Sequence, residues 1–213
     1  NSENLTLGSD SVIEYNRVTS GSTTFQVVTP RTDYKNLTIS TTGSIPTVTL
    51  AGATKVSGVL TVNANAILDS AGFLTLKSDA AGTARVAQVF GNITGKVTVE
   101  RYIPGKRAWR ALTAPVIGTS TNSIFANWQN GGTQSAGTGV ELWSTSGGSG
   151  MGTGPNNSIL KYNNQGTSGA WNAVTNTNDP LFGSSINNAF MVFVTGPYYT
   201  TNTNVATGFA DTI

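Results

Sequence analysis

The amino-acid sequence predicts an all-β protein, with a short parallel β-helix followed by an antiparallel, β-sandwich-like domain. Short pairs of apolar residues recur with the period of two that is typical of strands, and Gly, Asn, Ser or Asp bounds each pair. Helix signals are sparse, since the only candidate is a turn or two between Ser123 and Trp128. The pairs are Leu37 and Ile39, Val48 and Leu50, Leu60 and Val62, Leu74 and Leu76, and Val97 and Val99.

The spacing of these pairs favours stacked coils. The intervals are about 10 to 20 residues, which is too short for helical crossovers, and they vary as they would if each coil had loops of different length. An antiparallel sandwich also allows strands at such spacing and is the alternative. Hairpin dipeptides such as Asn-Gly are missing between the pairs, so we favour the parallel β-helix.

We place the boundary between two domains at Ile103-Pro104-Gly105, because proline cannot donate to a sheet and glycine permits a sharp turn. The predicted domains are residues 1–104, a set of β-helical coils, and residues 105–213, an antiparallel β domain. The N-terminal stretch repeats the apolar pattern less regularly and is either the opening coil or its cap. Its apolar residues are Leu5, Leu7, Val12, Ile13, Phe25, Val27 and Val28.

The second domain contains five strand candidates separated by loops rich in Gly and Asn. The third and fourth flank the segment Asn163 to Gly169, so we expect them to form a hairpin. Antiparallel pairing is therefore the prediction for this domain. The candidates are Ala108 to Leu112, Val140 to Trp143, Ile159 to Tyr162, Trp171 to Val174 and Phe190 to Val194.

Composition limits the classes of function. Charged residues make up 10% of the 213 residues and the formal net charge is +2, a field too weak to attract nucleic acid or an anionic membrane. Histidine and cysteine are absent, which removes the usual general base and two common metal ligands, so we expect no metal or other cofactor. No apolar run approaches the length of about 20 residues that spans a bilayer, so no membrane insertion is predicted. Because the chain begins at Asn1 and not at Met, we expect it to be a segment of a longer exported protein.

Several strings carry a resemblance to a protein family. Gly95 to Val116 reads GKVTVERYIPGKRAWRALTAPV, and YNNQGTSGAWNAVTNTNDPLFG and NAFMVFVTG follow further on. This region resembles very large cell-surface proteins of the Bacteroidota that the type IX secretion system exports, including gliding-motility adhesin-like proteins. The upstream segment from Tyr34 to Leu76 resembles the β-helical stretches that precede it there. The resemblance covers roughly residues 34 to 196, and VERYIP, RAWR and LTAPV are its most specific parts.

The resemblance implies an extracellular location at the bacterial cell surface and supplies no catalytic residues. This chain differs from the family at its last strand, which reads Phe193-Val194-Thr195-Gly196-Pro197, whereas relatives usually read closer to FVRGDR. Bacteria of this phylum also attach glycans at Asp followed by Ser or Thr and a small or apolar residue. This short pattern arises easily by chance in a Ser- and Thr-rich chain, and its acceptors here are Ser11, Ser70 and Thr212.

Charged side chains offer few sites for chemistry. Four acids occur from residue 33 to residue 100, and all but Glu100 stand beside turn residues, where Asp accepts hydrogen bonds from backbone amides; we expect structural roles for them. The alternative is a glycosidase pair, which needs two carboxylates at about 5 to 10 Å. The densest basic stretch, Lys96 to Arg110, is either an anionic-ligand platform or a joint between domains at which Glu100 pairs with an arginine, and we favour the joint. The other three acids are Asp33, Asp69 and Asp79.

Aromatic residues are the weak candidates for ligand binding. A face of such rings would stack on sugars, although each ring is equally suited to a sandwich core. Pro197 breaks a strand just before Tyr198 and Tyr199, so these two tyrosines are the best candidates for exposure. The residues are Trp128, Trp143, Trp171, Tyr198 and Tyr199.

Together these features predict a non-catalytic structural or adhesive protein outside the cell, which binds no nucleic acid. It is a candidate subunit of an end-to-end filament, joined to copies of itself or to other surface proteins through terminal β-strands such as residues 1–16 or 200–213. The alternatives are a carbohydrate-binding module with glycan partners and a β-helical polysaccharide lyase or hydrolase.

Overall fold

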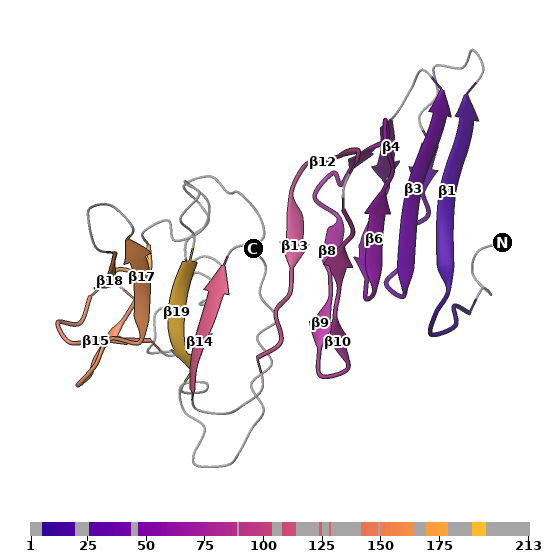
Figure 1. The fold of residues 1–213 in the computed structure, drawn as a ribbon. Helices are drawn as coiled ribbons and strands as arrows, with labels where there is room; N and C mark the ends of the chain where they lie inside the picture. The colour runs from indigo at the N-terminus through magenta and orange to yellow at the C-terminus, as the bar shows by residue number, and fades with distance from the viewer. Residues whose placement is uncertain are drawn as a thin grey trace. The chain divides into compact units, whose positions relative to one another are not determined.

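The computed structural model describes most of the chain as strands and turns (Figure 1). The chain divides into two compact units, Asn1–Tyr102 and Ile103–Ile213. The secondary-structure elements of the described residues are all strands, which confirms the predicted all-β class. The described residues are 6–19, 26–43, 47–88, 90–103, 108–113, 124, 128, 142–148, 150–163, 169–178 and 189–194.

Three parallel sheets form the N-terminal unit. The first contains, in spatial order, β1 (Val12–Thr19), β3 (Asn36–Gly43), β6 (Val59–Val62) and β11 (Arg85–Val86). The second contains β2 (Gln26–Val28), β4 (Thr47–Leu50), β7 (Ile67–Asp69) and β12 (Asn92–Thr94). The third contains β5 (Thr54–Val56), β8 (Leu74–Leu76) and β13 (Val97–Val99), and a parallel bridge from Tyr34 to Val56 extends it.

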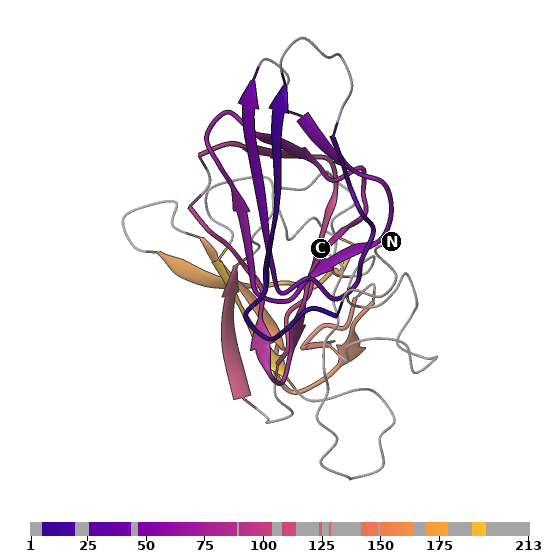
Figure 2. The same cartoon turned by 90° about the vertical axis from the view of Figure 1, so that its right-hand side faces the viewer.

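The chain visits the three sheets in rotation and so winds into a β-solenoid of about three turns. Paired residues are about 20 to 26 positions apart in sequence, which is the length of one coil. Figure 2 views the unit from its first coil, so that later coils lie behind earlier ones. The parallel β-helix is confirmed, and the N-terminal stretch is its opening coil.

Stacked aliphatic side chains fill the solenoid. Because side chains alternate along a strand, every second residue points inward and lies above its counterpart in the next coil. Leu37 pairs with Leu60, and Val56 pairs with Leu76. Three of these side chains are fully buried and Leu76 nearly so. Burying one such side chain stabilises the fold by about 1.5–3 kcal/mol.

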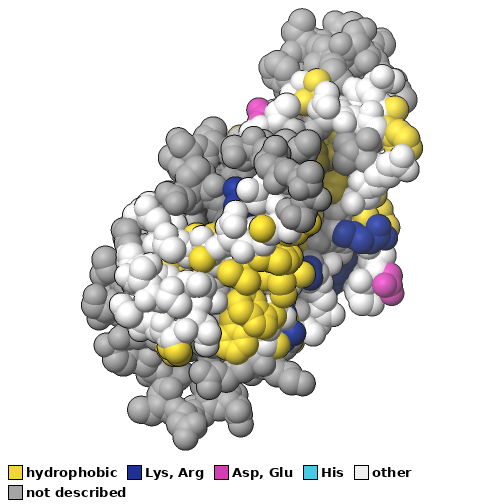
Figure 3. All heavy atoms as spheres, turned by 60° about the vertical axis from the view of Figure 1, so that its left-hand side comes forward, with side chains coloured by type: hydrophobic (Ala, Val, Ile, Leu, Met, Phe, Trp, Pro, Cys, Tyr) yellow, Lys and Arg dark blue, Asp and Glu magenta, His cyan; other side chains and the backbone are white. Residues whose placement is uncertain are grey.

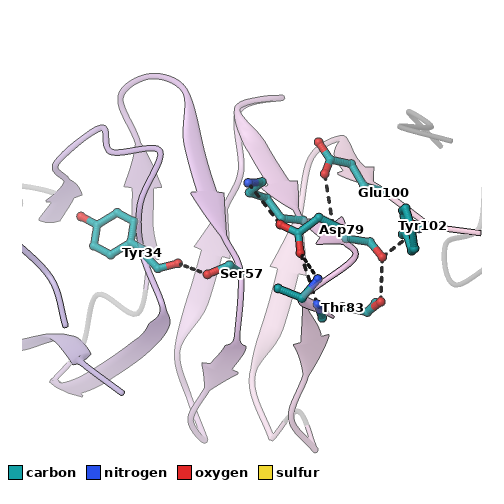
Figure 4. A network of polar contacts seen from close by, with 10 residues as sticks. Tyr34, Ser57, Asp79, Thr83, Glu100 and Tyr102 are labelled. Carbon is teal, nitrogen blue, oxygen red and sulfur yellow. Dashed lines mark hydrogen bonds and ion pairs between the residues drawn. The ribbon is translucent and has the colours of Figure 1, made fainter. Parts of the chain in front are cut away.

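Polar side chains bind successive coils at the corners. Asn36 Nδ2 donates to the carbonyl of Ser11 at 3.1 Å, and Asn36 Oδ1 accepts from the amide of Val59 at 2.9 Å. One amide side chain thereby links three coils. Ser57 Oγ donates similarly to the carbonyl of Tyr34 at 3.2 Å (Figure 4).

Two tyrosines close a hydrogen-bonded triangle in the first coil. Tyr34 OH donates to the carbonyl of Thr29 at 2.8 Å, and Tyr15 OH accepts from the amide of Thr29 at 3.0 Å. Since the Tyr34 proton is used, Tyr15 donates in the 2.8 Å bond between the hydroxyls. Burial, followed by the bond to Tyr15, raises the pKa of Tyr34 above its ordinary value.

A hairpin interrupts the last described turn. It consists of β9 (Ser78–Asp79) and β10 (Gly82–Thr83), which pair antiparallel. Asp79 Oδ1 accepts from the amides of Ala81 and Gly82 at 2.8 and 3.2 Å and so fixes the turn. The pattern of apolar pairs did not predict this insertion, because its strands contain no apolar pair.

The C-terminal unit is built on a four-stranded antiparallel sheet. Its strands, in spatial order, are β14 (Ala108–Thr113), β19 (Ala189–Val194), β17 (Ile159–Asn163) and β18 (Ala170–Ala173). The predicted hairpin is confirmed as β17 and β18. A further pair, β15 (Trp143–Ser144) and β16 (Gly152–Thr153), is parallel, and so departs from the antiparallel prediction.

One face of this sheet covers the core of the unit. Leu112, Phe190, Val192 and Ile159 point to this face from three strands. The rest of the core consists of Ile103, Ile124, Trp128, Leu142, Met151 and Val174. The amide of Trp128 donates to the carbonyl of Ile124 at 2.7 Å, the spacing of a helical turn.

Candidate functional site

The opposite face of the antiparallel sheet is also apolar. Along β14, Trp109 alternates with core-facing residues and is 39% exposed. Trp109 lies directly opposite Phe193, and Leu160 lies opposite Met191. Figure 3 shows hydrophobic side chains gathered on one face of the molecule. An antiparallel sheet more often presents alternating polar residues to water on its outer face, so this face requires an explanation.

A groove lies at one end of this face. Its volume is about 500 Å³, which falls within the range of ligand-binding pockets. Three aromatic rings, a proline, a leucine and three uncharged polar residues line it. They are Trp109, Trp143, Phe193, Pro155, Leu160, Asn156, Asn157 and Ser158.

Cross-strand pairing fixes the first two rings. Trp109 and Phe193 face each other on β14 and β19, and their ring centroids are 5.4 Å apart in an edge-to-face arrangement. This geometry is a favourable one for aromatic pairs. It leaves part of the indole surface of Trp109 accessible from the groove.

The third ring, Trp143, is held by its backbone and by a glycine. Ser158 Oγ accepts from the amide of Trp143 at 2.7 Å and donates to its carbonyl at 3.0 Å. Gly154 lies against the ring, and a Cβ there would be 2.9 Å from Cε3 of Trp143. Any residue other than glycine at this position would push the indole out of place.

The polar lining is uncharged. Asn157 Oδ1 accepts from the amide of Thr145 at 3.1 Å, which orients that side chain at the rim. The nearest strand cations, Arg110 and Lys161, alternate with groove or outer-face residues and so belong to the core-facing side of the sheet. The groove therefore offers ring faces and side-chain amides, a set suited to uncharged, hydroxyl-rich ligands.

The structure separates the aromatic candidates predicted from sequence. Trp143 lines the groove, and Trp171 on β18 is 45% exposed. Trp128 is 8% exposed and packs on Phe190 at 5.9 Å, so it fills the alternative role of a core residue. Tyr198 and Tyr199 lie outside the described residues.

Trp109 and Phe193 are the groove residues that sequence reasoning missed. The basic residues around Trp109 drew attention to a joint between domains, although Arg110 alternates with Trp109 and its Nε is buried. Side chains alternate between the two faces of a strand, so the sequence of Ala108–Thr113 already indicates that Trp109 lies on the face opposite Leu112. Lys106 and Arg107 of the same stretch lie outside the described residues.

The glycosylation candidates that the structure describes are inaccessible in the folded chain. Ser70 is fully buried, and its hydroxyl donates to the carbonyl of Lys96 at 2.6 Å, which binds adjacent coils. The hydroxyl oxygen of Ser11 is also buried. Thr212 lies outside the described residues.

The four acids from residue 33 to residue 100 have structural partners. Asp69 and Asp79 accept from backbone amides in turns, as predicted. Asp33 accepts two hydrogen bonds from Arg31, at 2.7 and 2.9 Å, and these bonds lower the pKa of Asp33. Glu100 forms no ion pair with an arginine among the described residues, and its Oε2 accepts from the amide of Ser78 at 3.1 Å (Figure 4); Arg107 lies outside the described residues.

Two features are absent from the described part of the chain. No three side chains of the kinds His, Cys, Asp and Glu gather there to hold a metal ion. No helix in that part has the length and apolar character needed to cross a membrane.

Comparisons with known proteins complete the description of the site. No protein-family model matches the chain, and neither curated proteins nor solved structures provide a match.

Proposed function

We propose that this chain is a non-catalytic adhesive segment of an extracellular bacterial cell-surface protein, in which the solenoid is a scaffold and the C-terminal unit contacts neutral glycans. The groove carries the proposal, because it combines three aromatic rings with uncharged hydrogen-bonding groups. The C–H groups of a sugar ring are attracted to the negative face of an aromatic ring. Amides and hydroxyls fix the orientation of a bound ligand.

The N-terminal unit supports the scaffold half of the proposal. A β-solenoid is consistent with a structural or surface protein. Its corner side chains are engaged in bonds between coils, as for Asn36 and Ser70. Bonds of this kind between coils suit the scaffold role that we propose.

Retardation in native gels that contain mannan, xylan or dextran tests the adhesive proposal. We expect the wild-type chain to be retarded by at least one of these neutral polysaccharides. Trp109→Ala and Trp143→Ala should each weaken binding about fivefold or more, the effect of losing one stacking platform. Phe90→Ala is the matched control, since Phe90 is 67% exposed in the other unit.

The result that would reject the proposal is wild-type migration unaffected by every polysaccharide. The proposal would also be rejected if Phe90→Ala reduced the retardation as much as Trp109→Ala does, because the binding would then not depend on the groove. Trp143→Phe keeps an aromatic ring and should retain most of the binding, which separates stacking from loss of fold.

End-to-end assembly is a second candidate, favoured by the open edge of β1. The amide of Asn36 donates to the carbonyl of Ser11, and Asn36 lies opposite Val12. The odd-numbered residues of β1 therefore turn their backbone groups toward β3, and the even-numbered ones turn theirs to the other edge. No described strand pairs with that edge, which is a template for a strand of another copy.

Asn16→Pro tests assembly, because it removes an amide from the open edge and leaves the bonds to β3 intact. Sedimentation and negative-stain electron microscopy should show oligomers or fibres of the wild type and of the control Asn16→Ala, and monomers of Asn16→Pro. A wild-type chain that stays monomeric at high concentration would remove filament formation from the proposal.

A further inference from the structure

We propose that the groove is one end of a longer binding track, which runs across the outer face of the antiparallel sheet and takes a linear neutral polysaccharide chain. The inference rests on the proposed function and specifies its ligand. A single sugar would need only the groove. The outer face carries a second pair of rings well outside the groove lining.

That second pair is Tyr162 on β17 and Trp171 on β18. They lie directly opposite each other, with ring centroids 5.1 Å apart. Trp171 is 45% exposed, the most accessible tryptophan of the described residues. Gly169 lies against Tyr162, where a Cβ would overlap the phenol, so the start of the strand leaves room for this ring.

Strand register places both pairs on one face. Tyr162 is two residues from Leu160 along β17, and Leu160 lines the groove beside Trp109 and Phe193. Residues two apart on a strand share a face. A row of apolar side chains crosses the sheet between the two pairs and connects them; it consists of Ala111, Met191, Leu160 and Ala173.

The spacing of the pairs suits a chain of several sugars. Along the strand direction, the two ring pairs are separated by four residues, or roughly 14 Å. Across the sheet, they are separated by two strand spacings, or roughly 10 Å. One sugar ring cannot touch both pairs. An oligosaccharide of a few rings running diagonally can stack on both at once.

Charge and shape favour a neutral polysaccharide over a charged one. Every strand residue that the register places on this face is uncharged, so the face offers an anionic polymer no countercharge. Small residues, Ala111 and Ala173, lie in the row between the ring pairs and keep the floor of the track low. Polar groups at the groove, Asn156 and Asn157, supply direction at one end.

A length series of oligosaccharides tests the track. The series is made from whichever of mannan, xylan or dextran retards the chain, and affinity is measured by calorimetry from the disaccharide upward. We expect affinity to rise with length until both ring pairs are covered and then to level off. Trp171→Ala should weaken binding of the long oligosaccharides about fivefold or more and leave the disaccharide unchanged.

Two variants control for indirect effects. Phe73→Ala removes a ring of similar exposure, 44%, from the solenoid and should change nothing. Trp171→Phe keeps a stacking face and should restore most of the dependence on length. Unfolding midpoints of all three variants verify that the fold is intact.

Other outcomes overturn the inference in distinguishable ways. If the disaccharide and the long oligosaccharides bind with equal affinity, and Trp171→Ala does not change that affinity, the ligand is confined to the groove and the proposed function stands. Absence of binding by every sugar would reject both. If sedimentation shows dimers that Trp171→Ala dissociates, and the affinity for sugars does not depend on their length, the outer face binds a second copy of the chain.

Discussion

In the N-terminal unit stacked aliphatic side chains fill the coils and the exposed apolar residues lie on different strands and loops, whereas in the C-terminal unit aromatic rings of neighbouring strands pair on the outer face of a sheet. The solenoid directs Leu37, Leu60 and Val62 inward and uses Asn36 to bind its coils. The antiparallel sheet buries Phe190 on one face and leaves Trp109 accessible on the other. Interior packing explains the stacked ladder of the first unit, where Val27, Phe73 and Phe90 are exposed but form no ring pair. The second has apolar surface beyond what its core requires, and such surface indicates a contact.

The largest expected effect is on the ladder inside the solenoid. Leu60→Ala deletes a fully buried side chain that pairs with Leu37, and should lower the free energy of unfolding of this unit by about 2–5 kcal/mol. Val27→Ala is the control, because Val27 is 51% exposed. Far-UV circular dichroism follows urea unfolding of the whole chain, and tryptophan emission follows the other unit alone, since all four tryptophans lie beyond residue 102. Equal effects of the two changes would mean that the ladder does not hold the coils.

Next in size is the corner amide. Asn36→Ala removes two bonds between coils and leaves the Val59 amide without its partner, so we expect a loss of about 1–3 kcal/mol. Asn16→Ala, at an exposed position of β1, should change stability by no more than about 0.5 kcal/mol. Urea midpoints compare the two variants. If they match, the stack depends on its apolar interior alone.

Tyr34→Phe sharpens the comparison through pH. Loss of the hydroxyl should lower stability by about 1 kcal/mol at neutral pH, since the bonds to Thr29 and Tyr15 are lost. The pKa of Tyr34 is raised by burial, so the neutral phenol stabilises the fold fully below its ordinary pKa near 10, and this stability is lost as pH rises toward the raised value. The stability difference between wild type and variant should therefore shrink above about pH 10. A constant difference across alkaline pH would contradict this assignment.

The smallest effect is expected at the surface ion pair. Asp33→Asn breaks the bonds with Arg31, but the carboxylate is exposed, so the loss should stay within about 1 kcal/mol. Because Arg31 lowers the pKa of Asp33, the contribution is present above the ordinary pKa and is lost as pH falls through the lowered one. Thermal unfolding between about pH 2 and 6 tests it, since this range brackets the ordinary pKa. A loss several times larger would mean that this corner depends on charge.

Much of the fold is legible in the sequence because the solenoid repeats a local rule. Leu37 with Ile39 and Leu74 with Leu76 mark strands by alternation and also lie in the core. Strand β5 (Thr54–Val56) was missed, because its inward positions are Thr54 and Val56 and a buried threonine breaks the apolar pair. Three strands per coil therefore emerged only in the structure.

The site was harder to predict because it depends on register between distant segments. Trp109 meets Phe193 across 84 positions of sequence, and nothing local to either residue specifies the partner. The sequence makes Trp143 a candidate because it is aromatic, but its place beside Asn156 and Asn157 follows from the turn between β16 and β17. Period two along a strand indicates its faces; it does not indicate which strand lies next to it.

Tryptophan emission during titration with neutral polysaccharide tests the central claim most directly. Trp109 and Trp143 line the groove, whereas Trp128 is buried in the core and serves as a constant background. We expect a saturable blue shift with mannan, xylan or dextran, which Phe90→Ala retains and Trp109→Ala strongly reduces. An emission spectrum that none of these polymers alters, in a chain that unfolds cooperatively, would contradict it.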